Sequence, residues 1–216
     1  MVDPPAIVYV DGFNLYHRAL RNTAFKWLDL GRLFELLLPD HRVQRIHYFT
    51  AKLDPVPHDR QLPQRQQIYL RALSTIPNLE IHYGHFRVRP RWMPNHPWEY
   101  DELGEPLKTG VQHFEEKGSD VNLATRLLVD AFTGATHTQV VVSSDSDLVA
   151  PMRYVRGALD RPLGLISPSP EPPKMLLGTN PTFYKQIRVG ALVNAQFPDR
   201  LWDEFGWFGK PDTWKS

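Results

Sequence analysis

The chain of 216 residues contains no cysteine. That absence excludes a disulfide framework, a thiolate metal site and a cysteine nucleophile. No apolar run approaches the length of about 20 residues that crosses a bilayer, and the first residues lack the basic-then-apolar layout of a secretion signal. We therefore expect a protein that has no membrane segment and resides in the cytoplasm.

Neither sign of charge is in excess. Lys plus Arg number 25 against 24 for Asp plus Glu, so the net charge is only +1. Binding of nucleic acid would therefore require a local basic patch rather than the charge of the whole molecule. The chain also lacks the two common glycine-rich phosphate loops, G-x-x-x-x-G-K-[ST] and G-x-G-x-x-G, which weakens the hypothesis of a phosphatase or a nucleotide-binding α/β protein.

What is present is an alternation of short apolar runs and amphipathic stretches. The apolar runs predict buried strands at 6–10, 43–50, 79–88, 138–144 and 162–167. The stretches between them have helical spacing at 13–20, 30–38, 60–76, 120–132 and 148–159, and Asp29 is the expected N-cap of the second helix. Such alternation is typical of a single α/β domain, here 1–216, with a mostly parallel sheet covered by helices on both faces.

Two segments interrupt this pattern. Residues 87–108 contain several prolines and are too polar for a core, so we expect a long functional loop or a small hairpin insertion there. The tail at 201–216 concentrates aromatic side chains: Trp202, Phe205, Trp207, Phe208 and Trp214. Aromatic residues at this density are expected to cover a face of the core or to form a contact in a homodimer.

Four aspartates are expected at one edge of the sheet. Asp11 ends the first strand, Asp145 and Asp147 follow the fourth, and Asp120 begins the helix that leads into the fourth. Taken singly, each is as easily explained as a turn residue or a helix cap. If the first and fourth strands are neighbours, however, the four carboxylates meet and require a counter-charge, for which Mg²⁺ or Mn²⁺ is the natural candidate. An oxygen-only site of this kind suggests phosphoester chemistry.

The polar residues near these aspartates each have two interpretations. Asn14 lies one helical turn after Asp11 and could hold that carboxylate or a metal-bound water, or simply lie on the helix surface. Ser143 and Ser144 could donate hydrogen bonds to the carboxylates or merely end the strand. Lys117 could contact a phosphate of the substrate or remain solvated.

Histidine offers a different metal chemistry. In the stretch "HYGH", His82 and His85 lie three residues apart, and residues three apart on a strand face opposite sides. Because they cannot chelate one ion together and no cysteine is available, zinc is not expected.

The segment 87–108 also offers a surface for single-stranded nucleic acid. It places Arg87, Arg89 and Arg91 beside Trp92. Basic side chains next to an aromatic platform suit single-stranded RNA. The alternative is a proline-rich surface loop whose tryptophans pack against the domain.

Three stretches resemble the signature blocks of the NYN domain family, PIN-like proteins related to metal-dependent ribonucleases. They are "VYVDGFNLYH" at 8–17, "EKGSDVNLATRLLVDAF" at 116–132 and "VVVSSDSDLVAPMRYV" at 140–155. The resemblance implies a PIN-like three-layer α/β/α sandwich with an acidic pocket, in which Asp11, Asp120, Asp145 and Asp147 occupy the positions of metal-binding carboxylates, with Asn14 beside them. Two positions depart from the family pattern: Arg126 replaces a residue that is often acidic, and Ser119 replaces one that is usually apolar.

The function that these observations predict is hydrolysis of RNA phosphodiester bonds by a metal-dependent ribonuclease. The aspartates with Asn14 would form the catalytic site and hold Mg²⁺ or Mn²⁺, while Lys117, Ser144, Arg87, Arg89, Arg91 and Trp92 would bind the RNA. The alternative is a non-catalytic RNA-binding or regulatory module that keeps the fold without turnover.

Overall fold

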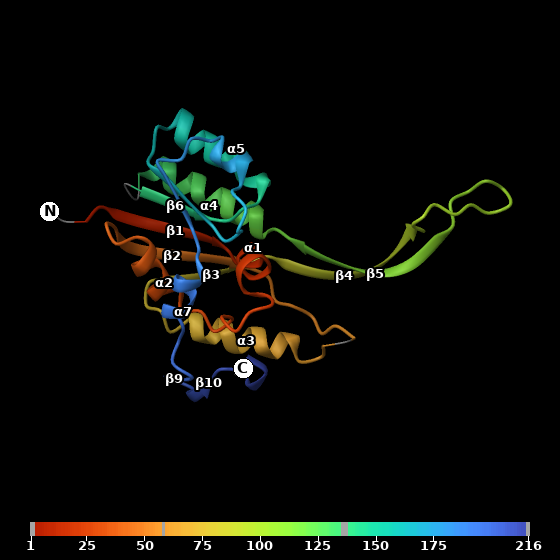
Figure 1. Ribbon diagram of the computed structural model, residues 1–216, viewed down its shortest axis with the longest axis horizontal. Helices are drawn as coiled ribbons and strands as arrows, with labels where there is room; N and C mark the ends of the chain where they lie inside the picture. The colour runs from red at the N-terminus through yellow and green to blue at the C-terminus, as the bar shows by residue number, and fades with distance from the viewer. Residues whose placement is uncertain (1–2, 58, 135–137, 215–216) are drawn as a thin grey trace.

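A six-stranded, all-parallel sheet forms the centre of the computed structural model, which describes residues 3–57, 59–134 and 138–214 (Figure 1). The strand order is β3-β2-β1-β6-β7-β8. Their bounds are β1 Pro5–Asp11, β2 Arg42–Thr50, β3 Leu79–Tyr83, β6 Thr138–Val142, β7 Leu163–Ser167 and β8 Phe183–Gln186. The first and fourth predicted strands, on whose pairing the acidic site depends, are neighbours. They are β1 and β6, which pair in parallel with Val10 beside Val142.

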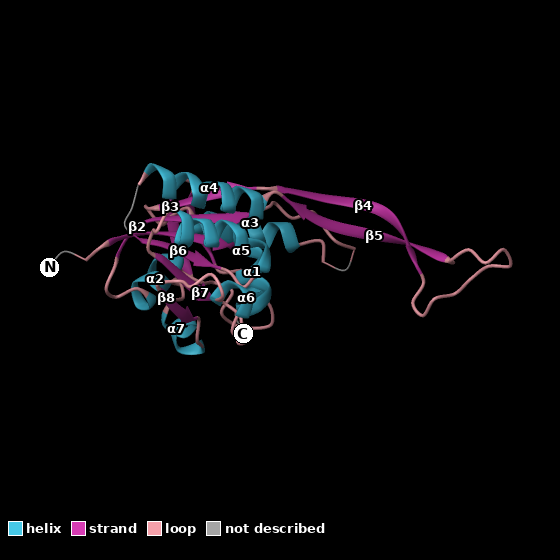
Figure 2. Ribbon diagram, turned by 90° about the horizontal axis from the view of Figure 1, so that it is seen from above, coloured by secondary structure: helices cyan, strands magenta, loops and turns pink. Residues whose placement is uncertain are grey.

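Helices cover both faces of this sheet, as alternation along β1 requires. Val8 and Val10 pack toward the layer of α1 (Gly12–Leu15), α2 (Leu30–Leu37), α3 (Leu62–Leu73) and α7 (Val189–Asn194). Ile7 and Tyr9 pack toward α4 (Ser119–Thr133), α5 (Val149–Arg153) and α6 (Lys174–Leu177). The prediction of a three-layer α/β/α domain with a parallel sheet is therefore confirmed (Figures 1 and 2).

Short irregular helices complete the connections. They are the π-helices η1 (Tyr16–Leu20) and η3 (Tyr154–Ala158) and the 3-10 helices η2 (Ser146–Leu148) and η4 (Asp212–Trp214). Asp29 caps α2 as expected, because its side chain accepts a hydrogen bond from the backbone N–H of Arg32. Among the residues that the structure describes, none of the helices combines the length and the apolarity that a bilayer crossing demands.

The prediction of one strand at 79–88 is wrong, because the chain turns out of the sheet at Gly84. β3 ends at Tyr83, and β4 (His85–Pro94) pairs instead in antiparallel fashion with β5 (Lys108–Lys117). A Cβ at Gly84 would lie only 2.8 Å from the Lys117 carbonyl oxygen and 2.9 Å from the Ser119 nitrogen. Glycine therefore permits the close approach by which the two chains leave the body together.

The β4–β5 ribbon, here called the arm, projects far from the body (Figure 2). Its register runs from His85 beside Lys117 to Pro94 beside Lys108. Large apolar side chains are exposed along it and at its tip: Trp92, Met93, Trp98, Tyr100, Leu103, Leu107 and Val111. The arm therefore leaves most of its large apolar side chains uncovered.

Only some aromatic side chains of the tail cover the core, one of the two roles that the sequence predicts for them. β9 (Arg200–Asp203) and β10 (Gly206–Gly209) form a hairpin, from which Phe208, and further on Trp214, pack against the core. Trp202, Phe205 and Trp207 remain exposed, at 63%, 80% and 67%. Their exposure leaves the homodimer contact a prediction.

Gly12 should be intolerant of any side chain. A Cβ there would lie 2.6 Å from the Tyr48 ring and 2.7 Å from the backbone oxygen of Phe49, and backbone cannot yield. We expect Gly12→Ala to lower the free energy of unfolding by about 1–3 kcal/mol, the usual effect of overpacking, measured by urea denaturation. Gly190→Ala is the matched control, since no atom lies within 4 Å of its added Cβ; equal stability of the two variants would contradict this account.

Candidate metal and phosphodiester site

Asp11 is the buried centre of the site. It lies at the carboxyl end of β1 and is 4% exposed. Its Oδ1 accepts a hydrogen bond from the backbone N–H of Asn14 at 2.9 Å, and its Oδ2 accepts one from the Ser143 hydroxyl at 2.9 Å. Two donors from two different elements therefore fix the orientation of this carboxylate.

Ser143 connects Asp11 to the second strand end. While its hydroxyl donates to Asp11, its oxygen accepts a hydrogen bond from the backbone N–H of Asp145 at 3.0 Å. Asp145 in turn caps η2, accepting from the backbone N–H of Asp147 at 3.0 Å. The capping interpretation thus applies to Asp145, and also to Asp11, which caps α1 through the backbone N–H of Asn14, while Asp147 itself is exposed to solvent.

Asn14 does not hold the carboxylate with its side chain. Its backbone does so, and its side-chain oxygen instead accepts hydrogen bonds from the Ser144 backbone N–H at 3.0 Å and the Ser144 hydroxyl at 2.9 Å. This pair fastens α1 to the loop after β6. Asn14 and Ser144 therefore position the two strand ends that carry Asp11 and Asp145.

Asp120 approaches from a third direction, in the first turn of α4. It is half-buried, and Glu116 at the end of the arm lies close enough for its charge to be felt. Glu116 Oε1 accepts a hydrogen bond from the backbone N–H of Ser119 at 3.0 Å. The sequence analysis missed Glu116, because nothing in its local pattern separates it from a surface glutamate of the arm.

The charges of neighbouring carboxylates raise the pKa of both Asp11 and Asp120. The pKa of the Asp11 carboxyl is raised to about 7, chiefly by burial and in part by the charges of Asp120 and Asp145, against the two hydrogen bonds that lower it. The pKa of Asp120 is raised to about 6, first by burial and then by Asp145, Glu116 and Asp147. A cation placed among these groups would relieve both shifts.

The expectation that four carboxylates meet within a few ångströms is too strong. Within the described residues, no three of these carboxylates bring ligand atoms within 4.8 Å of one another. Like charges repel, and Asp145 and Asp147 lie further toward solvent than Asp11. The arrangement is a looser acidic site that a cation would draw together.

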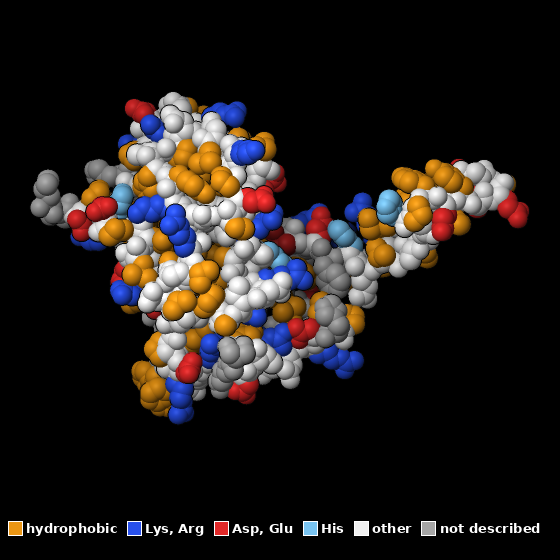
Figure 3. Space-filling view, viewed as in Figure 1, with side chains coloured by type: hydrophobic (Ala, Val, Ile, Leu, Met, Phe, Trp, Pro, Cys, Tyr) orange, Lys and Arg blue, Asp and Glu red, His pale blue; other side chains and the backbone are white. Residues whose placement is uncertain are grey.

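The aspartates open onto a large cleft of about 1160 Å³ between the α1–α3 side of the body and the base of the arm (Figure 3). Asp11, Asp120, Asp145 and Glu116 line it, together with the basic residues Arg18, Arg21, Lys26 and Arg65. We call this feature the acidic cleft. It exceeds the roughly 300–1,000 Å³ of small-molecule pockets, and its basic rim is a second feature that the sequence analysis did not pick out.

Three residues that the sequence analysis placed at the site lie outside the lining of this cleft. Asp147 and Ser144 are not among its lining residues. Lys117 is exposed and forms an ion pair with Glu115 at 3.3 Å along its own strand. A solvated, paired lysine fits its position better than a phosphate contact.

The arm separates the basic residues that the sequence analysis grouped with a tryptophan. Arg89 and Arg91 are exposed and share one face of β4, whereas Trp92 belongs to the other face, because side chains alternate along a strand. Phe86, on the same face as Trp92, lines the acidic cleft. The side chain of Arg87 lies outside the described part of the structure. Arg89, Arg91 and Trp92 therefore do not form one groove.

A parallel α/β/α sandwich with an acidic cleft at the carboxyl edge of its sheet defines the PIN-like class of proteins. Within that class, the NYN domain family matches residues 5–185, and the chain belongs to this family. The NYN family is nuclease-like, and domains of this kind typically use divalent metal ions.

The chain is also similar to one named protein in sequence and to one solved structure in fold. It is 30% identical over 185 residues to 6-hydroxy-3-succinoylpyridine 3-monooxygenase HspA of Pseudomonas putida (strain DSM 28022 / S16), an alignment that covers 75% of this chain and 59% of that protein. The chain thus spans well under two thirds of this relative's length. A crystal structure of a protein of unknown function, VPA0982 from Vibrio parahaemolyticus RIMD 2210633, has a TM-score of 0.53 at 13% identity and covers 87% of this chain and 94% of that one. This second likeness supports the fold alone.

Proposed function

We propose that the protein is a metal-dependent ribonuclease that hydrolyses RNA phosphodiester bonds in the acidic cleft. The main support for this proposal is the carboxylate of Asp11. It is buried at a strand end, it is oriented by two hydrogen bonds, and the charges of Asp120 and Asp145 raise its pKa. A buried carboxylate surrounded by others is unfavourable in its charged form, and either a proton or a cation offsets that charge. Family membership supports the same chemistry.

The donor set fits Mg²⁺ or Mn²⁺. The candidate ligands around Asp11 are carboxylate oxygens, the ligand type that these hard ions prefer. Asp11, Asp120 and Asp145 would hold the ion, and Glu116 lies beside them. The chemistry supplied by a bound Mg²⁺ or Mn²⁺ is neutralisation of charge on the phosphodiester and acidification of the attacking water.

The chain itself supplies orientation and substrate binding. Ser143 and the Asn14 backbone hold Asp11 in one orientation, which avoids rearrangement when the substrate arrives. Arg18, Arg21 and Lys26 line the same cleft as the carboxylates and offer cations for the phosphates that flank the cleaved bond. Phe86 and, beyond it on the same face of the arm, Trp92 offer surfaces on which bases of a single strand would stack.

The non-catalytic RNA-binding module is the weaker alternative. It explains the basic rim and the exposed aromatic residues of the arm. It leaves one feature without an explanation. Capping of α1 and the hydrogen bond from Ser143 account for the Asp11 side chain itself, but not for Asp120, whose charge raises the pKa of Asp11.

A second candidate function comes from the relative whose name describes oxidation of 6-hydroxy-3-succinoylpyridine. A monooxygenase of that kind would act on a small aromatic acid rather than on a polymer. Oxygen uptake on adding 6-hydroxy-3-succinoylpyridine and a reductant, with no cleavage of any RNA, would favour it over the ribonuclease.

The ribonuclease proposal is tested with end-labelled RNAs, single-stranded and structured, incubated with the protein in Mn²⁺, in Mg²⁺ or in EDTA. We expect cleavage that requires metal and that falls by more than about 100-fold in Asp145→Asn, since even groups that merely orient metal ligands contribute 10–100-fold. Asp160→Asn, on the exposed loop after η3, is the control that should cleave normally. Binding of RNA without cleavage under every metal would instead establish the non-catalytic module.

A further inference from the structure

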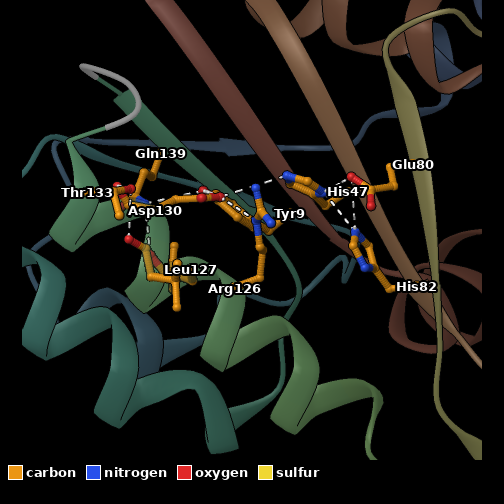
Figure 4. A network of polar contacts seen from close by, with 10 residues as sticks. Tyr9, His47, Glu80, His82, Arg126, Leu127, Asp130, Thr133 and Gln139 are labelled. Atoms are coloured by element: carbon orange, nitrogen blue, oxygen red, sulfur yellow. Dashed lines mark hydrogen bonds and ion pairs between the residues drawn. The ribbon is translucent and has the colours of Figure 1, made fainter.

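A second group of potential metal ligands lies on the α4 face of the sheet, away from the acidic cleft. It consists of His47 on β2 with Glu80 and His82 on β3, and we call it the His–Glu–His cluster (Figure 4). Glu80 and His82 are two residues apart on one strand, so they point to the same face. His47 is the register partner of Glu80 on the neighbouring strand, which brings all three side chains together.

The spacing of the three ligand atoms suits a single ion. His47 Nδ1 lies 2.8 Å from His82 Nε2 and 3.5 Å from Glu80 Oε2, and His82 Nε2 lies 3.8 Å from that oxygen. Bonds of about 2.0–2.1 Å to a tetrahedral ion place its ligands about 3.3 Å apart. The three observed distances bracket that value, so small side-chain movements would complete the geometry.

The surroundings of the His47 ring suit a metal ion bound at its Nδ1. The ring is 0% exposed, and its Nε2 has no hydrogen-bond partner, yet it lies 3.8 Å from Asp130 Oδ2. A metal ion bound at Nδ1 would leave the proton of the ring on Nε2, which faces the Asp130 carboxylate. Carboxylates in this position orient metal-binding imidazoles and raise their basicity.

Asp130 is itself held rigidly. It accepts hydrogen bonds from the Tyr9 hydroxyl at 2.8 Å and from Arg126 Nε at 2.9 Å, and Gln139 donates to Tyr9 at 3.3 Å (Figure 4). The guanidinium of Arg126 would repel a nearby cation, but its ion pair with Asp130 offsets this charge. Arg126 is also one of the two positions at which the chain departs from the family pattern.

We propose that His47, Glu80 and His82 form a binding site for a divalent transition-metal ion that prefers imidazole, with Zn²⁺ as its first candidate. Two imidazoles and one carboxylate are a ligand set found for Zn²⁺ and for other transition ions. The side chains of His82 and Glu80 are 22% and 54% exposed, so the fourth position of the ion would face solvent. An ion with an open position can bind a further ligand, whereas a structural zinc is enclosed by four protein ligands.

This site differs from the acidic cleft in both place and chemistry. None of its three residues lines the cleft, whose lining includes residues of α1, α3, the base of the arm and the first turn of α4. Its nitrogen ligands select ions that an all-oxygen site does not. Zinc was not expected from the sequence, where only His82 and His85 were considered together. His85 belongs to the arm, whereas His82 meets His47, which is 35 residues away in sequence.

Titration of the metal-free protein with Zn²⁺ by calorimetry, and with Co²⁺ by visible absorption, tests the proposal. We expect one tight site per chain with the intense absorption of four-coordinate Co²⁺. His82→Gln and Glu80→Gln, which alter partly exposed groups and should fold, are expected to weaken binding at least tenfold. His85→Gln is the matched control, an exposed histidine nearby in sequence that should bind as the wild type does.

Asp145→Asn distinguishes binding at the His–Glu–His cluster from binding in the acidic cleft. This variant should bind Zn²⁺ and Co²⁺ as the wild type does, even if it no longer cleaves RNA. The proposal is overturned if wild type and His82→Gln bind both ions equally, or if neither ion binds at micromolar concentration. It is also overturned if only Asp145→Asn loses the ions.

Discussion

Asp11→Asn is expected to abolish metal-dependent RNA cleavage and, in metal-free buffer above pH 7, to make the protein more stable. Loss of a metal-binding carboxylate should lower the cleavage rate by more than about 100-fold, since groups that only orient such ligands contribute 10–100-fold. The opposite effect on stability follows because the carboxylate is buried among like charges. Few substitutions other than those at functional sites change activity and stability in opposite directions.

The raised pKa of Asp11 fixes the direction in which the stability of the protein changes with pH. The pKa of Asp11 is raised from its ordinary value of 3.8 to about 7, so between these values the folded state binds a proton that the unfolded state releases. Stability therefore is greatest below about pH 4 with respect to this group and falls as pH rises toward 7. Asp11→Asn should flatten this part of the profile, and added Mg²⁺ or Mn²⁺ should reverse the fall in wild type only.

The gain from Asp11→Asn should be about 1–2 kcal/mol at pH 8, less than the pKa shift alone implies. Both Ser143 and the Asn14 backbone donate to this side chain, and an amide can accept from only one of them without turning its own donor toward the other. Urea unfolding with and without EDTA measures the effect. Asp40→Asn, at an exposed loop, should change neither activity nor stability; a destabilised but active Asp11→Asn would contradict the account.

Asp130→Ala is expected to lower the free energy of unfolding by about 3 kcal/mol. Its carboxylate is 4% exposed and joins the Tyr9 hydroxyl, Arg126 and, at 3.8 Å, the ring of His47. Removal of one partner from a buried ion pair costs about 3–5 kcal/mol. Arg126 is 34% exposed and can turn toward water, which places the expected effect at the lower end of that range.

The measurement is a urea unfolding curve of Asp130→Ala beside one of Tyr9→Phe. Tyr9→Phe removes the hydroxyl that donates to Asp130 and accepts from Gln139, but it leaves the ion pair, so we expect a loss of about 1–2 kcal/mol. A loss below 0.5 kcal/mol in Asp130→Ala, on the order of an ordinary surface substitution, would show that the polar network of Figure 4 does not stabilise the fold.

Much of the fold could be predicted because its strands are buried on both faces and end at clear turn signals. The run at 6–10 became β1, the valines before Ser143 became β6, and Asp29 capped its helix. The pairing of β1 with β6 could only be stated as a condition, since register between distant strands is decided by packing rather than by local pattern. Once that pairing holds, Asp11 and Asp145 lie at neighbouring strand ends.

What could not be predicted depends on contacts between distant residues. The break at Gly84 follows from the close approach of the chain at Lys117 and Ser119, which no local pattern reveals. His47 and His82 meet only through the β2–β3 register. Spacing along a helix suggested three places for the Asn14 side chain: against Asp11, against a metal-bound water or on the helix surface. It instead accepts two hydrogen bonds from Ser144 on another element.

We propose that the carboxylates of the acidic cleft hold the divalent ion used in cleavage. Anomalous X-ray scattering from a crystal of the protein soaked in Mn²⁺ locates that ion directly. We predict a peak among Asp11, Asp120 and Asp145, absent from crystals of Asp11→Asn. If the cleft shows no peak at saturating Mn²⁺, or if Mn²⁺ is found only at His47, Glu80 and His82, the proposed catalytic site is wrong.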